Sequence, residues 1–513
     1  QDIQFKHYWG ENKHPEFLLG YQDIPEQQAQ LPLTVDFNDC GHILVVGSPG
    51  YGKSTFIQNA LIDVMRKTTP EQSHIYLYDF GTSGLISLVD FPHVADYFTA
   101  DDNEKVMKSL RRLQKEVKVR KAALSEARSS NMQQYNRDAV TPFPSLFISI
   151  DSFDGVSDAT FSEAFNETVN ILAREGASLG IYLITTMSRF NAMRVQLQAN
   201  FKTKIALYLF EQSDVTSIVG RTDQVLLDIR GRGLMKQDSV VSFQVCVPYT
   251  SEDNSSMIQQ VKAEAQEMSH YWTGALPHPI PMLPEVVTPE MVEAQVARAE
   301  RNHQVLLGLT REMVEVAAFT LDKAISLVSD NVRSVTQFYK VLAYQLQQYT
   351  TPVQVVIVDP LGLVPLDQFK KAHRFSDTLS AKEGMNIILD NLKERMTQPG
   401  EYTQSLIIIP DIQILGQSLN ITENQFKELL LEGPKYGITP VFVGNYKDLM
   451  TNYSTLVTLH RQLATQVFMG MRISDQEYVR FPYISNEKSP RPNEGYIVDA
   501  EGYEFVQLMS IEE

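Results

Sequence analysis

The amino-acid sequence predicts an α/β protein of two tandem units, each a mostly parallel sheet with helices on both faces. Short β-branched runs alternate with helical patterns in the first half of the chain, which is typical of parallel sheets. The order of motifs in that half then recurs in the second. We place the units at residues 1–275 and 290–513 and expect a proline-rich linker at residues 276–289.

Five strands are expected in the first unit besides the central one at His42–Gly47, and the longest helix is expected near Val106–Leu124. The strands lie at Ile75–Tyr78, Leu146–Ile150, Ile181–Thr185, Ile205–Leu209 and Val240–Val247. In the second unit, the sequence pattern of Val305–Leu309 repeats that of Phe17–Tyr21, and Ser405–Ile409 repeats Leu146–Ile150. The strand Ala324–Val328 and the helix Val335–Leu346 repeat the first strand, loop and helix, and the segment Tyr436–Val443 repeats Leu179–Ile184.

Composition is that of a globular protein with a sizeable core, since 43% of the 513 residues are hydrophobic and 21% are charged. The net charge of −17 argues against a nucleic-acid partner, because phosphate binding depends on clustered Lys and Arg. Two cysteines cannot form a disulfide framework, so a reducing cytoplasm is expected. No apolar run approaches the ~18 residues that span a bilayer. The chain begins without Met, so we expect a segment of a longer protein.

The segment after the central strand predicts a phosphate-binding loop. It matches G-x-x-x-x-G-K-S in full and stands between a predicted strand and a predicted helix. Its glycines permit positive φ, so successive N–H groups can face phosphates. Lys53 is expected at the β- and γ-phosphates of ATP, and Ser54 at Mg²⁺. The expected ATP contacts are Gly47, Ser48, Pro49, Gly50, Tyr51, Gly52, Lys53, Ser54 and Thr55.

A second carboxylate strand completes the expected site. Leu146–Ile150 is an apolar run that ends at Asp151, which should orient the Mg²⁺ shell. The next position, where a Glu usually activates the attacking water, is Ser152. A hydroxyl is a poor general base, and such a base contributes typically ~10²–10⁴-fold, so hydrolysis is expected to be slow. Asp154 is an alternative base acting through water.

Three further residues are candidates with an open alternative each. Thr186, at the end of the next strand, is either a γ-phosphate sensor or an ordinary strand-end residue. Arg120 falls on the apolar stripe of the long helix, where it either snorkels or reaches a neighbouring subunit's nucleotide. Arg232 belongs to a Gly-Arg-Gly turn that is either only a turn or an edge contact with nucleotide or subunit.

The second unit is expected to lack this chemistry. Repeat order lays Ser329–Thr336 on the phosphate loop. Ser329 and Ser334 then replace the flanking glycines, Val335 replaces the lysine, and Asp330 adds a negative charge. Thr336 alone is retained, and Asp411 cannot rebuild the site, so we expect the second unit not to bind ATP and to serve as a docking surface or a packing partner.

These motifs together resemble the FtsK/SpoIIIE branch of RecA-like P-loop ATPases. The resemblance includes the segments after the carboxylate strand at Leu172–Ile181, Asn200–Ala206 and Gly231–Met235. Within the branch, Gly20–Gln28 is similar to the EssC/EccC coupling ATPases of type VII secretion. The tandem arrangement with a degenerate last copy resembles the C-terminal two ATPase domains of that family.

The resemblance implies part of a membrane-anchored, hexamerising motor on the cytoplasmic side of a bacterial membrane. Such a motor recognises small WXG-type proteins and effectors and drives their export. Two alternatives remain: a DNA translocase of the same branch, which would be expected to show a basic face, and a docking platform whose ATP is structural. Ser152 favours the platform, whereas the intact loop Gly47–Ser54 favours a working ATPase.

Overall fold

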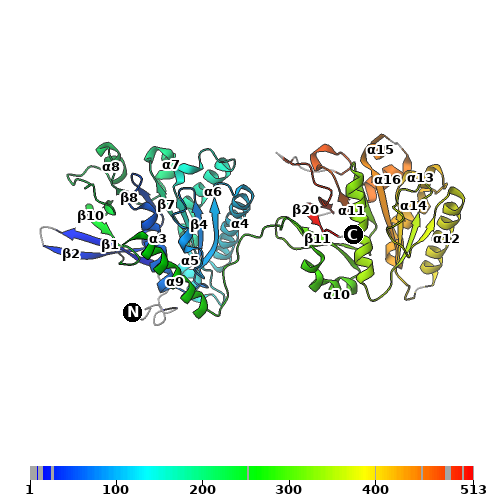
Figure 1. Ribbon diagram of the computed structural model, residues 1–513, viewed down its shortest axis with the longest axis horizontal. Helices are drawn as coiled ribbons and strands as arrows, with labels where there is room; N and C mark the ends of the chain where they lie inside the picture. The colour runs from blue at the N-terminus through cyan, green and yellow to red at the C-terminus, as the bar shows by residue number, and fades with distance from the viewer. Residues whose placement is uncertain are drawn as a thin grey trace. The chain divides into compact units, whose positions relative to one another are not determined.

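The computed structural model consists of two compact units, residues 1–280 and 281–513, which are considered separately (Figure 1). It describes residues 9, 15–24, 28–250, 253–398, 400–451, 454–479, 484, 487–499 and 502–511. Residues 25–27 of the expected Gly20–Gln28 motif lie outside the described residues. Within the part that is described, no helix has both the length and the apolar composition needed to cross a bilayer.

The first unit contains a ten-stranded sheet of order β2-β1-β10-β9-β8-β3-β7-β6-β4-β5. The six strands from β8 to β5 pair in parallel, and the other four pair antiparallel. The expectation of a mostly parallel sheet is therefore confirmed. Its strands are β1 Glu16–Ile24, β2 Ala29–Asp36, β3 Ile43–Val46, β4 Ser73–Asp79, β5 Val94–Thr99, β6 Ser145–Asp151, β7 Ile181–Met187, β8 Thr203–Leu207, β9 Arg232–Lys236 and β10 Val240–Val245.

Helices cover both faces of this sheet, because alternate residues of its strands enter two separate cores. Leu44 and Val46 pack with α4 Asn103–Ala127 and α6 Ser162–Glu175. Ile43 and Val45 pack on the other face with α3 Lys53–Lys67 and α9 Asn254–Tyr271. The remaining helices are α2 Phe37–Cys40, α5 Met132–Asp138, α7 Val195–Gln198 and α8 Gln212–Val219.

The second unit repeats the topology strand for strand, with the order β12-β11-β20-β19-β18-β13-β17-β16-β14-β15. Its strands are β11 Gln304–Thr310, β12 Val316–Thr320, β13 Ile325–Ser329, β14 Gln354–Val358, β15 His373–Phe375, β16 Ser405–Ile409, β17 Ile438–Asn445, β18 Val467–Met469, β19 Glu494–Val498 and β20 Tyr503–Leu508. Its helices are α10 Glu293–Arg301, α11 Val332–Gln348, α12 Thr378–Thr397, α13 Gln413–Gln417, α14 Glu423–Leu431, α15 Tyr446–Thr451 and α16 Thr455–Leu463.

The repeat extends to a local irregularity. The pairing register shifts between Leu18 and Gly20 in β1, and between Leu306 and Gly308 in β11. A Cβ at Gly20 would lie 2.0 Å from the carbonyl oxygen of Gln244, and one at Gly308 would lie 1.9 Å from that of Gln507. Glycine is therefore required at both bulges, where a neighbouring strand approaches the backbone closely.

The proline-rich segment has no helix or strand between Tyr271 and Pro289, yet much of it is packed. Ile280 is buried in the core of the first unit, and its N–H donates to Asp96 at 2.8 Å. Val287 is fully buried in the second unit, and its carbonyl accepts from the N–H of Ser510. The predicted linker at 276–289 is thus an extended segment in which Ile280 packs into the first unit and Val287 into the second.

Candidate nucleotide-binding site

The phosphate loop occupies the carboxyl end of β3, in the middle of the first sheet. Six residues, 47–52, separate β3 from α3. The φ angles of Gly50 and Gly52 are +85° and +99°, a region that favours glycine. A Cβ on Gly47 would lie 2.8 Å from Cβ of Leu207, so this glycine lets β8 approach the loop. The loop backbone is fixed by bonds from Gly47 N–H to Met187 O and from Ser48 N–H to Tyr208 O.

Lys53 begins α3 and folds back over the loop that precedes it. Its ammonium donates to the carbonyl oxygens of Gly47 at 2.8 Å and Ser48 at 3.1 Å. The side chain is only 8% exposed, and burial lowers the pKa of Lys53, whereas Asp151 and Asp154 act in the opposite direction. A desolvated cation held only by neutral carbonyls gains from an anion, so this position suits a phosphate.

Ser54, Asp151 and Thr186 form a buried hydroxyl–carboxylate chain at the edge of the loop. Ser54 Oγ donates to Asp151 Oδ2 at 2.6 Å, and Thr186 Oγ1 donates to Asp151 Oδ1 at 2.5 Å. Both carboxylate oxygens therefore have a fixed direction. Burial raises the pKa of Asp151, and Asp79 adds to that increase, whereas the two hydroxyl donors and Lys53 oppose it.

Thr186 does not have the free hydroxyl that a phosphate sensor would use. Its Oγ1 also accepts from the backbone N–H of Ser152 at 2.9 Å, and the residue is completely buried. Its contacts make it a positioning residue for Asp151 and for the start of the next loop.

Asp79 was not predicted, although it lies beside Asp151. It ends β4 in direct register with Asp151 at the end of β6. Its carboxylate accepts from the N–H of Leu85 at 2.9 Å and from the hydroxyl of Tyr97 at 3.2 Å. A strand that ends in Asp is the pattern that identified Asp151, so the same pattern at Ile75–Asp79 could have identified Asp79.

The loop that Asp79 holds closes over Ser54. A Cβ on Gly84 would lie 2.8 Å from Ser54 Oγ and 3.2 Å from Asp151 Oδ2. The carbonyl of Gly84 is fixed by Gln58 Nε2 at 2.6 Å. Asp79 therefore organises one wall of the candidate metal position.

Ser152 stands next to this wall in an unusual backbone conformation. Its φ of +61° is left-handed, and a Cβ on Gly81 would lie 2.6 Å from its Oγ. Asp154 accepts from the N–H of Ser188 at 3.3 Å, at the end of β7. Its charge raises the pKa of Lys53, so Asp154 lies within electrostatic reach of the loop.

Neither prediction for Arg120 fits its surroundings. The side chain is fully buried, so it neither snorkels to water nor extends to a neighbouring subunit. Its guanidinium donates to the carbonyls of Leu179 and Pro144 and to Glu116, each at 2.8 Å. Arg120 thus ties α4 to the starts of β6 and β7, which is a structural role.

The Gly-Arg-Gly turn lies against the phosphate loop. Gly231 N–H donates to the carbonyl of Tyr51 at 3.2 Å, and a Cβ on Gly52 would lie 3.5 Å from Gly231 N. Arg232 is instead paired with Asp23 of β1, and that bond holds the pKa of Asp23 below its usual range. The turn therefore borders the loop, whereas its arginine joins β9 to β1.

In the second unit the phosphate loop is shortened as well as substituted. Only Asp330 and Asn331 separate β13 from α11. Ser334, Val335 and Thr336 lie inside α11, where Thr336 Oγ1 donates to the carbonyl of Val332. The positions matched to Gly52, Lys53 and Ser54 therefore lie in a helix that begins earlier after its strand than α3 does, so they form no phosphate loop.

The carboxylate of the second unit is also displaced. β16 pairs Ser405 with Ile438, just as β6 pairs Leu146 with Ile181, so Pro410 occupies the position of Asp151. Asp411 follows at the position of Ser152 and accepts from the N–H of Gln413 at 2.9 Å.

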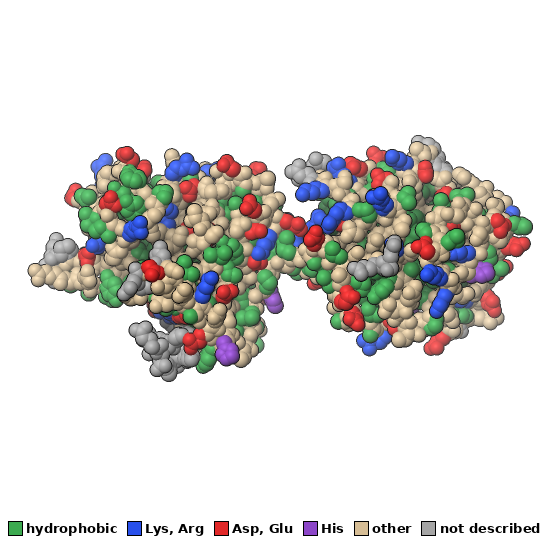
Figure 2. Space-filling model, in the orientation of Figure 1, with side chains coloured by type: hydrophobic (Ala, Val, Ile, Leu, Met, Phe, Trp, Pro, Cys, Tyr) green, Lys and Arg blue, Asp and Glu red, His purple; other side chains and the backbone are tan. Residues whose placement is uncertain are grey.

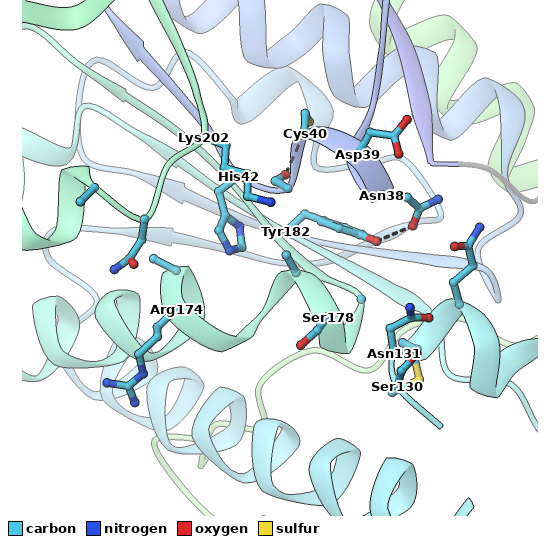
Figure 3. A pocket seen from close by; sticks show the side chains of 18 residues that line it. Asn38, Asp39, Cys40, His42, Ser130, Asn131, Arg174, Ser178, Tyr182 and Lys202 are labelled. Atoms are coloured by element: carbon cyan, nitrogen blue, oxygen red, sulfur yellow. Dashed lines mark hydrogen bonds between the residues drawn. The ribbon is translucent and has the colours of Figure 1, made fainter. Parts of the chain in front are cut away.

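A separate polar cavity of about 560 Å³ lies at the opposite, amino-terminal edge of β3 and β7 (Figure 3). His42 and Tyr182 line it, with Arg174 and Lys202 near its margin. Tyr182 donates to Asn38 at 2.8 Å, and burial lowers the pKa of His42 to about 4. The phosphate loop follows β3, so this cavity is distinct from the candidate nucleotide site.

Comparison with known proteins agrees with this geometry. The FtsK/SpoIIIE family model matches residues 7–237. Residues 7–237 therefore contain a domain of the FtsK/SpoIIIE type. Such P-loop ATPases bind nucleotide together with a divalent metal, and the Ser54–Asp151 pair has oxygen ligands that suit Mg²⁺.

The tandem architecture also has known counterparts. The type VII secretion system protein EssC of Staphylococcus aureus strain MSSA476 is 32% identical over 509 residues, which is 99% of this chain and 34% of that protein. The chain therefore spans about a third of this relative's length. ATPases 2 and 3 of EssC from Geobacillus thermodenitrificans have a similar structure, with a TM-score of 0.83, 25% identity and coverage of 97% and 96% of the two chains.

A more distant structure shares the fold. ATPases 2 and 3 of EccC from Thermomonospora curvata, in complex with a signal sequence peptide, superpose with a TM-score of 0.61. The identity is 18%, and the match covers 99% of this chain and 95% of that one.

Proposed function

We propose that the first unit binds ATP·Mg²⁺ and works as a slow ATPase within a type VII secretion motor. The observation that carries the proposal is the hydrogen bond of 2.6 Å between Ser54 and Asp151 beside an intact glycine loop. Ser54 and Asp151 would hold the metal, which neutralises charge on the β- and γ-phosphates. Lys53 would exchange its two carbonyl partners for phosphate oxygens.

Lys53→Ala tests binding. Removing the ammonium should weaken ATP·Mg²⁺ binding by about 100-fold or more, because charge-assisted bonds to phosphate are among the strongest in proteins. Isothermal calorimetry on the whole chain gives the affinity, and Lys204→Ala is a control because this partly exposed lysine lies on β8 outside the loop. Affinity unchanged in Lys53→Ala would reject the assignment.

We expect slow ATP turnover because the hydroxyl of Ser152 is a poor general base. We expect a rate well below the 1 s⁻¹ that marks the lower end of typical enzymes. Asp154→Asn should reduce any residual rate if Asp154 activates water. A wild-type rate of about 10 s⁻¹ would show that another residue is an effective base.

The second unit is proposed to be inactive toward ATP and to present a surface for other proteins. Loss of the loop removes the anion site, whereas the core and topology are intact. Secreted WXG-type proteins and effectors, other domains of a longer motor and a homo-hexamer are the proposed partners, on the cytoplasmic side of a bacterial membrane. The signal sequence peptide bound to T. curvata EccC supports a role in cargo recognition.

Capture of secreted substrates would test that role. A fluorescent WXG-type protein should bind the whole chain with equal affinity whether or not Lys53 is replaced, because the proposed docking surface does not use the nucleotide site. Loss of cargo binding in Lys53→Ala would place recognition in the first unit instead.

A further inference from the structure

An aromatic surface borders the phosphate loop on the side away from Asp151. In the first sheet β3 lies between β7 and β8. Thr186 and Asp151 come from β7 and β6, on one side of the loop. Tyr208 directly follows β8 on the other side, and its carbonyl accepts from the N–H of Ser48 at 2.8 Å.

The central ring of this surface belongs to the loop itself. The rings of Tyr51 and Tyr208 lie 4.5 Å apart between centroids, at 33°. The Tyr51 hydroxyl donates to Asp228 at 2.6 Å, and its carbonyl accepts from Gly231. The ring is therefore held at both ends before any ligand arrives.

Apolar side chains extend the surface into solvent. Phe210 packs its ring 5.5 Å from that of Tyr208, edge to face, yet is 77% exposed. Hydrophobic side chains are visible at this corner of the unit, over α8 and the adjoining chain (Figure 2). Those more than 40% exposed in the segment before β9 are Val225, Leu227 and Ile229. A cluster of large exposed apolar groups beside a polar site is typical of a binding surface.

The expected position of the phosphates indicates what this surface binds. Under the proposed function, Lys53 and the Ser54–Asp151 pair would hold the terminal phosphates and the metal toward β6. The loop around Gly84 closes that side, since even a Cβ there would meet Ser54 at 2.8 Å. The ribose and base of a bound nucleotide must therefore leave the loop toward β8.

We propose that Tyr51, together with Tyr208 and Phe210, forms the platform on which the nucleotide base stacks. This inference rests on the proposed ATP-binding function and adds the residues that recognise the base. Aromatic rings recognise bases by stacking, and Asp228 keeps the Tyr51 ring in place. Phosphate binding and base binding then use opposite sides of one loop.

Two ligands separate these contributions. ATP and inorganic tripolyphosphate, each with Mg²⁺, should be titrated by calorimetry into the whole chain. Tyr51→Ala should weaken ATP binding by about tenfold or more, the effect expected for losing one stacked base, and leave tripolyphosphate affinity within about twofold. Tyr51→Phe should retain most ATP affinity, because it keeps the ring and loses only the bond to Asp228.

Phe210→Ala tests the platform with a change that should leave the phosphate loop intact, because this exposed side chain is outside the loop. It should weaken ATP binding by a few-fold and leave tripolyphosphate unaffected. Equal weakening of both ligands by Tyr51→Ala, or no weakening of ATP by either alanine variant, would overturn the platform. Failure of the wild type to bind either ligand would reject the proposed function itself.

Discussion

The two units share one sheet and differ at the loop after its central strand. In the first unit six residues join β3 to α3, and in the second unit two residues join β13 to α11. The strand order is otherwise the same. The same fold therefore occurs with and without the phosphate loop in a single chain, and the comparison separates polar residues that accompany the loop from those that both units share.

The second unit has a serine where the first unit has the first glycine of its phosphate loop. The strand register places Ser329 opposite Gly470, and it places Gly47 opposite Leu207 in the first unit. A Cβ on Gly470 would lie 2.9 Å from Ser329 Oγ, just as one on Gly47 would lie 2.8 Å from Leu207. The small residue has changed strands, so close packing is retained without a phosphate loop.

Two polar features persist in both units. Arg395 of α12 donates to the carbonyls of Tyr436 and Thr403, as Arg120 of α4 does to those of Leu179 and Pro144. Asp359 directly follows β14 and accepts from the N–H of Val364, much as Asp79 accepts from that of Leu85. Because these features occur both with and without the phosphate loop, we expect them to stabilise the fold.

The largest expected effect is from the two arginines. Arg120→Ala leaves the carbonyls of Leu179 and Pro144 without their donor, and each unsatisfied buried group costs about 1–3 kcal/mol. Arg395→Ala should destabilise the chain less, because its bonds to carbonyls are 3.0–3.3 Å long rather than 2.8 Å. Thermal unfolding of the whole chain measures both, and Arg120→Lys should fail to rescue because it lacks the planar fork.

An unfolding temperature unchanged in Arg120→Ala, with ATP turnover lost only in an oligomer, would contradict this assignment. Such a result would restore the inter-subunit role that the sequence left open for Arg120.

Asp79 at the end of β4 and Asp359 directly after β14 provide a second matched pair. Asp79→Ala and Asp359→Ala each leave buried N–H groups without an acceptor, which should lower the free energy of unfolding by about 1–3 kcal/mol. Only Asp79→Ala should also weaken ATP·Mg²⁺ binding, by about tenfold, because its loop places Gly84 against Ser54. Calorimetry and thermal unfolding on both variants make the comparison, and equal nucleotide affinity in the two would show that the loop does not support the site.

The sequence was informative wherever a local pattern sufficed. Alternating strands and helices predicted the parallel half of each sheet, and the glycine motif placed its loop correctly between β3 and α3. The predicted strand Ile205–Leu209 is found two residues earlier, at Thr203–Leu207. Short strands with mixed burial such as β5 were missed, because tertiary pairing rather than periodicity defines them.

Long-range contacts set the limits of sequence analysis. The partners of Arg120 are carbonyls 24 and 59 residues away in the sequence, and no local sequence pattern predicts these contacts. The shortened loop was missed for another reason. Asn331 caps α11 by accepting from the N–H of Arg333, and a capping residue at that position favours a helix that begins at Val332.

The smallest expected effect comes from Asp151, which ends β6, and Asp411, which follows β16. Burial raises the pKa of Asp151 above its ordinary 3.8, so the folded chain holds that proton more tightly than the unfolded chain does. The free energy of unfolding therefore falls as pH rises from 3.8 to the raised pKa. At neutral pH the buried, charged carboxylate destabilises the folded chain. Asp151→Asn removes the charge, and its amide can still bond the hydroxyls of Ser54 and Thr186.

We expect Asp151→Asn to raise the unfolding temperature of the nucleotide-free chain at pH 7 by a few degrees, on the order of 1 kcal/mol. The gain should shrink as pH falls through the raised pKa of the wild-type carboxylate, and the Mg²⁺-dependent part of ATP affinity should be lost. Asp411→Asn, at a partly exposed position whose pKa is also raised by burial, should change stability less and leave ATP binding unaltered. A lower unfolding temperature for Asp151→Asn at pH 7 would mean that attraction to Lys53 outweighs the burial of the charge. The first unit would then be stabilised by its active-site carboxylate, and the contrast with the second unit would have to be sought in packing alone.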